Sequence, residues 1–131
     1  MKLVLNKKLT LTYTVVETFE AGIELFGFEV KSLRSKLGSL DGSKVIIRGG
    51  EAFLVGSYIP PYQASNSPKD YDEHRTRRLL LSKEQIATLA DKEQAKTLTI
   101  HPFSLYTKGP HIKCEVALCK KVQKHDKRES I

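Results

Sequence analysis

Three of the glutamates in the first third of the chain, Glu20, Glu24 and Glu29, could supply acid–base chemistry. If they lie on a strand, Glu20 and Glu24 share parity and point to the same side. A glycosidase needs two carboxylates about 5–10 Å apart across a sugar cleft. The chain contains no G-x-S-x-G, P-loop or H-E-x-x-H pattern that would complete an enzyme site. We therefore expect no enzyme, and a small hydrolase using Glu20 and Glu24 is kept only as an alternative.

The two cysteines, Cys114 and Cys119, lie five residues apart. On a strand this odd separation places them on opposite faces, where a disulfide is difficult to form. We expect two reduced thiols with a packing role. The four histidines are scattered and the chain has no C-x-x-C pattern, so no metal and no other cofactor is expected.

Positive charge is the strongest compositional signal. The 131 residues include 22 Lys and Arg against 15 Asp and Glu, a net charge of +7, and the isoelectric point is about 9.4. Four cations and no acid lie between Arg75 and Lys83, and five cations against one acid lie between Cys119 and Arg128. Each cluster could be a solvated face. Two clusters on a basic chain favour nucleic-acid binding.

The length predicts a single domain. No apolar run approaches the ~20 residues of a membrane span. The N-terminal residues MKLVLNKK lack the apolar stretch of a secretory signal. We expect a cytoplasmic protein with no membrane partner and no small-molecule substrate.

The elements that position these residues are predicted to be mostly strands. Gly49-Gly50 between two strand-like runs predicts a tight hairpin. Ser82 with Gln85 three residues later predicts a capping box at a helix start. Residue types predict strands at 9–26, 44–48, 52–59, 97–106 and 111–118, helices at 28–34 and 82–95, and loops at 37–43 and 62–78.

Short turns between neighbouring strands predict antiparallel pairing. The fold class is therefore mainly β with two or three flanking helices, as a small curled antiparallel sheet or barrel. Partly open barrels of this size commonly bind oligonucleotides on one face and through its loops. After Cys119 the apolar pattern ends, and the charged segment that follows is expected to be disordered alone.

Three separated stretches resemble one known family. They read FEAGIELFGFEVKSLR at 19–34, RTRRLLL at 75–81 and KKVQKHDKRESI at 120–131, and GGEAFL at 49–54 lies between them. In this order they resemble the small protein B (SmpB) family. The resemblance implies an oligonucleotide-binding-like β-barrel that binds RNA over residues 1–119, and a basic C-terminal tail over residues 120–131.

The resemblance also implies a non-enzymatic function. The family binds the tRNA-like domain of transfer-messenger RNA and delivers it to stalled ribosomes for trans-translation, mimicking the anticodon arm of a tRNA. The expected partners are therefore transfer-messenger RNA and the decoding centre of the small ribosomal subunit. A general oligonucleotide-binding module acting in translation is the alternative.

Ten residues of the body are assigned to RNA binding by the resemblance. Glu20 would accept hydrogen bonds from base N–H groups or orient a neighbouring arginine, unless it is a solvated strand acid. Arg75 and Arg77 would contact phosphate or anchor a loop. The segment before them reads DEH, where the family often has Asp-Pro-Thr. The full set is Asn6, Lys7, Glu20, Lys31, Arg34, Arg75, Arg77, Leu81, Ser82 and Lys113.

The tail is assigned to the decoding centre. Its cations would be attracted to ribosomal RNA with a strong salt dependence, and His125 would stack on a base. Family tails continue for many more charged residues than the segment ending at Ile131, so a shortened or unusually short tail is expected. The tail residues with this assignment are Lys120, Lys121, Lys124, His125, Asp126, Lys127 and Arg128.

Overall fold

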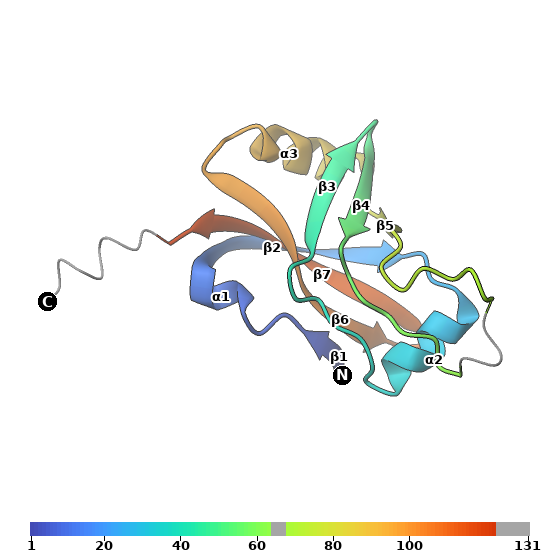
Figure 1. The fold of residues 1–131 in the computed structure, drawn as a ribbon. Helices are drawn as coiled ribbons and strands as arrows, with labels where there is room; N and C mark the ends of the chain where they lie inside the picture. Colours follow the sequence, from blue (N-terminus) through green and yellow to red (C-terminus); the bar gives the residue numbers. More distant parts are fainter. Residues whose placement is uncertain (64–67, 123–131) are drawn as a thin grey trace, which may run out of the picture.

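The computed structural model describes residues 1–63 and 68–122. Within them, seven strands form one antiparallel sheet of order β1-β6-β7-β2-β5-β4-β3, accompanied by three helices (Figure 1). The strands are β1 (Lys2–Leu5), β2 (Tyr13–Ile23), β3 (Lys44–Arg48), β4 (Glu51–Val55), β5 (Arg77–Leu80), β6 (Leu98–Lys108) and β7 (His111–Lys121). The helices are α1 (Leu9–Thr12), α2 (Gly27–Arg34) and α3 (Lys83–Glu93).

The turn and cap predictions are confirmed. β3 and β4 are joined by Gly49 and Gly50, whose φ angles of 59° and 75° are accessible to glycine without steric cost. α3 begins at Ser82, whose Oγ accepts a hydrogen bond from the Gln85 N–H at 3.1 Å. The Gln85 side chain accepts in return from the Ser82 N–H, also at 3.1 Å. The β3–β4 turn and the start of α3 are therefore both set by residues close together in the sequence.

The mainly β prediction is confirmed, but the sheet is not closed into a barrel. In the described chain β1 pairs only with β6, and β3 only with β4, so these strands are the two edges of an open sheet. Bulges in β2 and β6 add local twist. The sheet curls until His101 on β6 meets the residue before β3, with its Nδ1 3.4 Å from the Ser43 carbonyl oxygen.

Two segments near the N-terminus differ from the predicted elements. Lys2–Leu5 form β1, where no strand was predicted. Leu9–Thr12 form a helical turn and the strand starts only at Tyr13. Because Leu9–Thr12 alternate apolar and polar residues as a strand does, the sequence pattern could not separate this helical turn from the strand that follows it.

Two further boundaries depend on long-range pairing. Arg77–Leu80, at the end of a predicted loop, form β5 because they pair with both β2 and β4. β7 continues to Lys121, so Lys120 and Lys121 pair with Thr14 and Tyr13. The first two residues assigned to the tail therefore belong to the sheet.

The main core lies between the inner face of the sheet and the helices α2 and α3. Leu33 of α2 and Leu89 of α3 are fully buried there. A smaller cluster lies under α1 on the other face of β7. Cys114 belongs to the first cluster and Cys119 to the second, which confirms their opposite orientation as free thiols. Burial raises the pKa of Cys114 to about 12, so this thiol stays protonated at neutral pH.

Within residues 1–63 and 68–122, no helix has the length and apolar character needed to cross a bilayer.

Candidate nucleic-acid interface

A row of residues crosses five strands on the face of the sheet opposite the main core. Gly22 of β2 pairs with Leu80 of β5 on one side and with Lys113 of β7 on the other. Lys113 in turn pairs with Tyr106 of β6, and Tyr106 with Lys2 of β1. We call these five residues the cross-strand row. The row faces outward, because the neighbouring residues along these strands, among them Ala21 and Cys114, enter the main core.

Glu20 lies beside the cross-strand row, and its carboxylate is held by two groups from β6. The Tyr106 hydroxyl donates to Oε1 at 2.5 Å, and the Lys108 ammonium donates to Oε2 at 2.9 Å. The bond from Tyr106 and then that from Lys108 lower the pKa of Glu20, and the Lys113 charge acts in the same direction. Glu20 is therefore a fixed carboxylate at neutral pH, with cations on both sides.

A second carboxylate, Glu115, lies directly opposite Glu20 across the β2–β7 pair. Its Oε1 accepts a hydrogen bond from the Ser104 hydroxyl at 2.9 Å. The interface thus presents acceptors as well as cations and an aromatic ring. Ammonium groups suit phosphate, whereas carboxylates suit the N–H groups of base edges. This mixture favours recognition of a particular RNA surface over simple attraction to polyanions.

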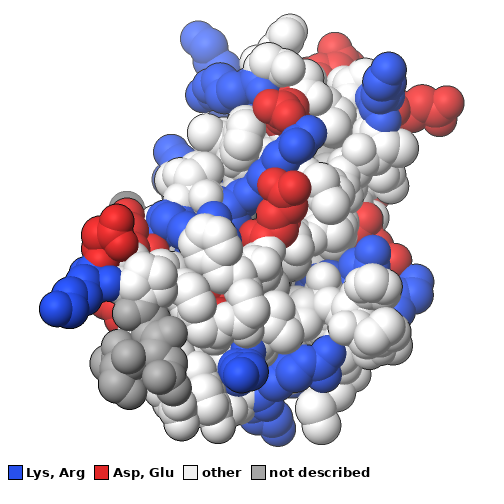
Figure 2. Space-filling view, turned by 90° about the vertical axis from the view of Figure 1, so that its right-hand side faces the viewer, with Lys and Arg blue, Asp and Glu red and all other residues white. Residues whose placement is uncertain are grey.

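The end of α2 adds exposed cations near the β6–β7 turn. Lys31 and Arg34 are both exposed, and the Arg34 guanidinium donates to the Pro110 carbonyl at 3.1 Å. Figure 2 faces the side of the molecule that is on the right in Figure 1. Near the lower edge of this view, at the height of α2, Lys and Arg side chains have no acidic neighbours. Higher on the same side, acidic and basic side chains alternate.

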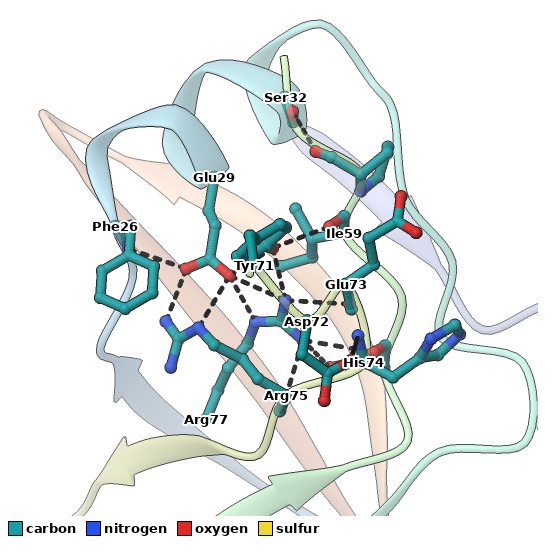
Figure 3. A network of polar contacts seen from close by, with 12 residues as sticks. Phe26, Glu29, Ser32, Ile59, Tyr71, Asp72, Glu73, His74, Arg75 and Arg77 are labelled. Carbon is teal, nitrogen blue, oxygen red and sulfur yellow. Dashed lines mark hydrogen bonds and ion pairs between the residues drawn. The ribbon is translucent and has the colours of Figure 1, made fainter. Parts of the chain in front are cut away.

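Arg75 and Arg77 turn inward toward Glu29 instead of facing solvent (Figure 3). The Arg75 Nη2 lies 2.6 Å from Oε1 of Glu29, and the Arg77 Nη2 lies 2.7 Å from Oε2. The Arg77 side chain is 0% exposed and also donates to the Ser57 hydroxyl at 2.9 Å and to the Tyr71 hydroxyl at 2.9 Å. A phosphate contact by Arg77 is incompatible with this burial, and its geometry fits the alternative role of a loop anchor.

Glu29 joins α2 to the loop before β5. Burial raises the pKa of Glu29, but the bonds from Arg75, from the Phe26 N–H and from Tyr71 and Arg77 outweigh burial and lower the pKa overall. Glu29 is therefore an ion-paired structural carboxylate. Its two oxygens are occupied by these partners, which fits a structural role.

The DEH segment at 72–74 is fastened by the same group of contacts. The Arg77 Nη2 donates to the Glu73 carbonyl at 3.1 Å, and Asp72 Oδ1 accepts from the His74 N–H at 2.9 Å. The Arg75 guanidinium also packs on the Phe26 ring, 4.0 Å from its centroid. The segment is therefore held in place by contacts from Arg77 and Arg75.

The remaining predicted residues divide into structural and exposed ones. Asn6 is buried, and its Nδ2 donates to the Pro102 carbonyl at 2.9 Å, which ties the end of β1 to β6. Lys7 is exposed. Leu81 is half-buried against the core, and the Ser82 hydroxyl is used as the cap of α3.

Leu81 and Ser82 directly follow Leu80 in the chain, so they lie next to one end of the cross-strand row. Tyr106, Lys108, Lys2 and Leu80 were not among the predicted site residues. Only the strand register places them beside Glu20 and Lys113, and sequence spacing carries no signal for it. Of the tail residues, Lys124, His125, Asp126, Lys127 and Arg128 lie outside the described part of the chain.

The open antiparallel sheet and its mixed-charge outer face define a small β-sheet protein with a surface suited to nucleic acid. Comparison with known proteins gives the family. The model of the SmpB protein family matches residues 3–131. The chain therefore belongs to the SmpB protein family, as its sequence motifs predicted.

Individual relatives agree. An SsrA-binding protein of Mesoplasma florum is 42% identical over 127 residues, which cover 97% of this chain and 85% of that protein. An SsrA-binding protein of Chromohalobacter salexigens is 43% identical over 123 residues, which cover 94% of this chain and 78% of that protein. A solved chain from "tmRNA-SmpB: a journey to the center of the bacterial ribosome" superposes with a TM-score of 0.78 at 34% identity, covering 95% of this chain and 87% of that one.

Proposed function

We propose that this chain binds the tRNA-like domain of transfer-messenger RNA, also called SsrA RNA, and delivers it to stalled ribosomes for trans-translation. In this role it takes the place of a tRNA anticodon arm, acts in the cytoplasm where ribosomes are found, and catalyses no reaction. The observation that carries the proposal is 42% identity over 97% of the chain to an SsrA-binding protein. The likeness to a chain of the tmRNA–SmpB structure supports it.

The outer face around the cross-strand row is the proposed contact surface for this RNA. Lys113 and Lys108 attract phosphate, and Glu20 fixes the position of Lys108 or accepts from a base edge. The Tyr106 hydroxyl holds Glu20 in place, so it is a positioning residue in this account. These side chains come from three adjacent paired strands, which makes the surface rigid before RNA arrives.

The proposed surface extends in two directions. Beyond Leu80 it reaches Leu81 and Ser82, where the first backbone N–H groups of α3 favour a phosphate. Beyond Lys108 it reaches the exposed cations Lys31 and Arg34 at the end of α2, with Arg34 already touching the β6–β7 turn. Lys7 and the exposed edge of Arg75 add charge at the periphery, whereas Asn6 and Arg77 support the fold beneath it.

The segment after β7 is proposed to have a separate function. Its cations Lys124, Lys127 and Arg128 would be drawn to ribosomal RNA of the decoding centre, and His125 would stack on a base there. Lys120 and Lys121, which belong to β7, would carry the same charge onto the body of the protein.

Replacing either Glu20 or Lys113 with alanine should weaken binding to the tRNA-like domain by about 1–3 kcal/mol, because each removes a charged contact from the interface. The measurement is a titration of the RNA domain at fixed salt concentration. Asp91→Ala and Lys92→Ala are matched controls, since both residues are exposed near the C-terminal end of α3, and their affinities should equal that of the unchanged protein. Unchanged affinity in both the Glu20 and Lys113 variants would remove the basis of this surface assignment.

A further inference from the structure

A groove lies at the other end of β2 from Glu20, between α1, β3 and β6. Two hollows of about 280 and 530 Å³ adjoin there, and both are lined by Tyr13, Lys44 and His101. We call the combined hollow the Tyr13 groove. It occupies the gap where the sheet fails to close, because β3 approaches β6 without pairing with it. Its combined size is in the range of pockets that hold small molecules or single nucleotides.

Two aromatic rings meet where the hollows join. The rings of Tyr13 and His101 have their centroids 4.4 Å apart and are tilted by 42°. The His101 ring is fixed by Thr99, whose Oγ1 lies 2.9 Å from Nε2, and by the Ser43 carbonyl near Nδ1. Burial lowers the pKa of His101, so this ring is uncharged near neutral pH. Within the described chain the Tyr13 hydroxyl has no hydrogen-bond partner, so it is free for a ligand.

The groove is surrounded by positive charge. Lys8, Lys44 and Arg48 line it. Arg48 lies 3.6 Å from Glu93, the one acidic residue that lines these two hollows in the described chain, and Lys8 lies 3.9 Å from Asp41. Among the described residues Lys44 makes no ion pair. Lys121, at the end of β7, pairs directly with Tyr13 and brings a further cation to the rim. The surroundings therefore complement a polyanion, not a basic peptide or a neutral apolar segment.

The Tyr13 groove is separate from the interface around Glu20. Tyr13 and Glu20 are seven residues apart on β2, which corresponds to about 23 Å along a strand. In Figure 1, α1 and the end of β7 lie on the left side of the molecule, whereas α2 lies on the right. One RNA contact at Glu20 therefore leaves the groove accessible to a different stretch of RNA.

We infer that the Tyr13 groove binds one unpaired nucleotide of single-stranded RNA, with its base against the Tyr13–His101 ring pair and its phosphate between Lys44 and Lys121. Aromatic platforms flanked by cations are how proteins hold single strands without reading their sequence. The free Tyr13 hydroxyl would bond the base edge or a ribose hydroxyl. This inference deepens the proposed function and rests on it for the class of ligand, RNA.

The test is a fluorescence titration of the full chain with a labelled single-stranded hexanucleotide of adenosines. We expect Tyr13→Ala to weaken binding about tenfold, as for loss of one stacked base. Lys44→Ala should weaken binding about threefold and reduce the slope of log affinity against log salt by about one. Tyr13→Phe keeps the ring and should stay within about twofold of the unchanged protein. Glu20→Ala should bind the hexanucleotide normally.

The same variants are then titrated with the tRNA-like domain. Tyr13→Ala and Lys44→Ala should retain its affinity, whereas Glu20→Ala should lose it. Unchanged hexanucleotide affinity in Lys44→Ala, whose exposed side chain is not needed for folding, would overturn the inference. An equal loss of affinity for both RNAs in Tyr13→Ala would also overturn the inference, because the groove would then not be a separate site. Failure of the unchanged protein to prefer the tRNA-like domain over tRNA would contradict the proposed function alone.

Discussion

Replacing Arg77 with methionine is expected to lower the free energy of unfolding by about 3 kcal/mol. The substitution removes every bond that the buried guanidinium makes to Glu29, Ser57 and Tyr71. It leaves the Glu29 carboxylate buried with Arg75 as its remaining ion-pair partner. Because that partner persists, the loss should fall at the lower end of the 3–5 kcal/mol typical for a broken buried pair. Urea denaturation followed by circular dichroism measures it.

Arg78→Met is the matched control. Arg78 is the next residue along β5, but its side chain is 46% exposed and forms a surface ion pair with Glu51 at 2.6 Å. Exposed pairs contribute at most about 1 kcal/mol, so this variant should remain close to the unchanged protein. Equal urea midpoints and equal slopes of the unfolding free energy against urea concentration for Arg77→Met and Arg78→Met would contradict the anchor role of Arg77. A loss of RNA affinity in Arg77→Met without a loss of stability would instead support a direct phosphate contact.

Removing residues 123–131 is expected to abolish ribosome rescue while affinity for the tRNA-like domain stays within about twofold. The structure sets the cut after Val122, because the Val122 N–H donates to the Thr12 carbonyl at 2.9 Å. A cut before Lys120 would also remove two residues that pair with β2 and would disturb the sheet. The cations beyond Val122 are the groups proposed to engage ribosomal RNA. Peptide tagging on ribosomes stalled at the end of a message lacking a stop codon is the readout.

A full-length variant with Lys124, Lys127 and Arg128 changed to glutamine separates charge from length. If the attraction is electrostatic, this variant should also fail in tagging, and raising the salt concentration should reduce tagging by the unchanged protein more than tagging by this variant. Normal tagging by the shortened chain would show that the C-terminal segment has no function of its own. Weakened binding to the tRNA-like domain by the shortened chain would place that segment in the first interface.

Local chemistry in the sequence was enough to predict several elements. Two glycines with positive φ define the β3–β4 turn, and a serine–glutamine capping box starts α3. Such signals act over three or four residues, so they are visible without the fold. β5 was missed for the opposite reason. Its four residues, RRLL, become a strand only because β2 and β4 offer ladders on both sides.

The candidate interface was predicted only in part, because some of its residues are brought together by long-range strand pairing. The family motif indicated Glu20 and Lys113, and the register of β2 and β7 places them two residues apart on neighbouring strands. Tyr106 and Lys108 could not be found, because their approach to Glu20 depends on the pairing of a strand more than 80 residues away. The sequence left two roles open for Arg77, phosphate contact and loop anchor, because a basic residue in a basic run gives no sign of its burial. Its partner, Glu29, lies 48 residues earlier.

The most direct test of the account is a competition titration with the unchanged chain. A labelled tRNA-like domain of transfer-messenger RNA is bound first, and an elongator tRNA is added as competitor at several salt concentrations. We predict a preference for the tRNA-like domain that persists at physiological salt, because carboxylate and aromatic groups of the outer face add to simple phosphate attraction. Equal binding of both RNAs, lost together as salt rises, would contradict it and leave a general oligonucleotide-binding module.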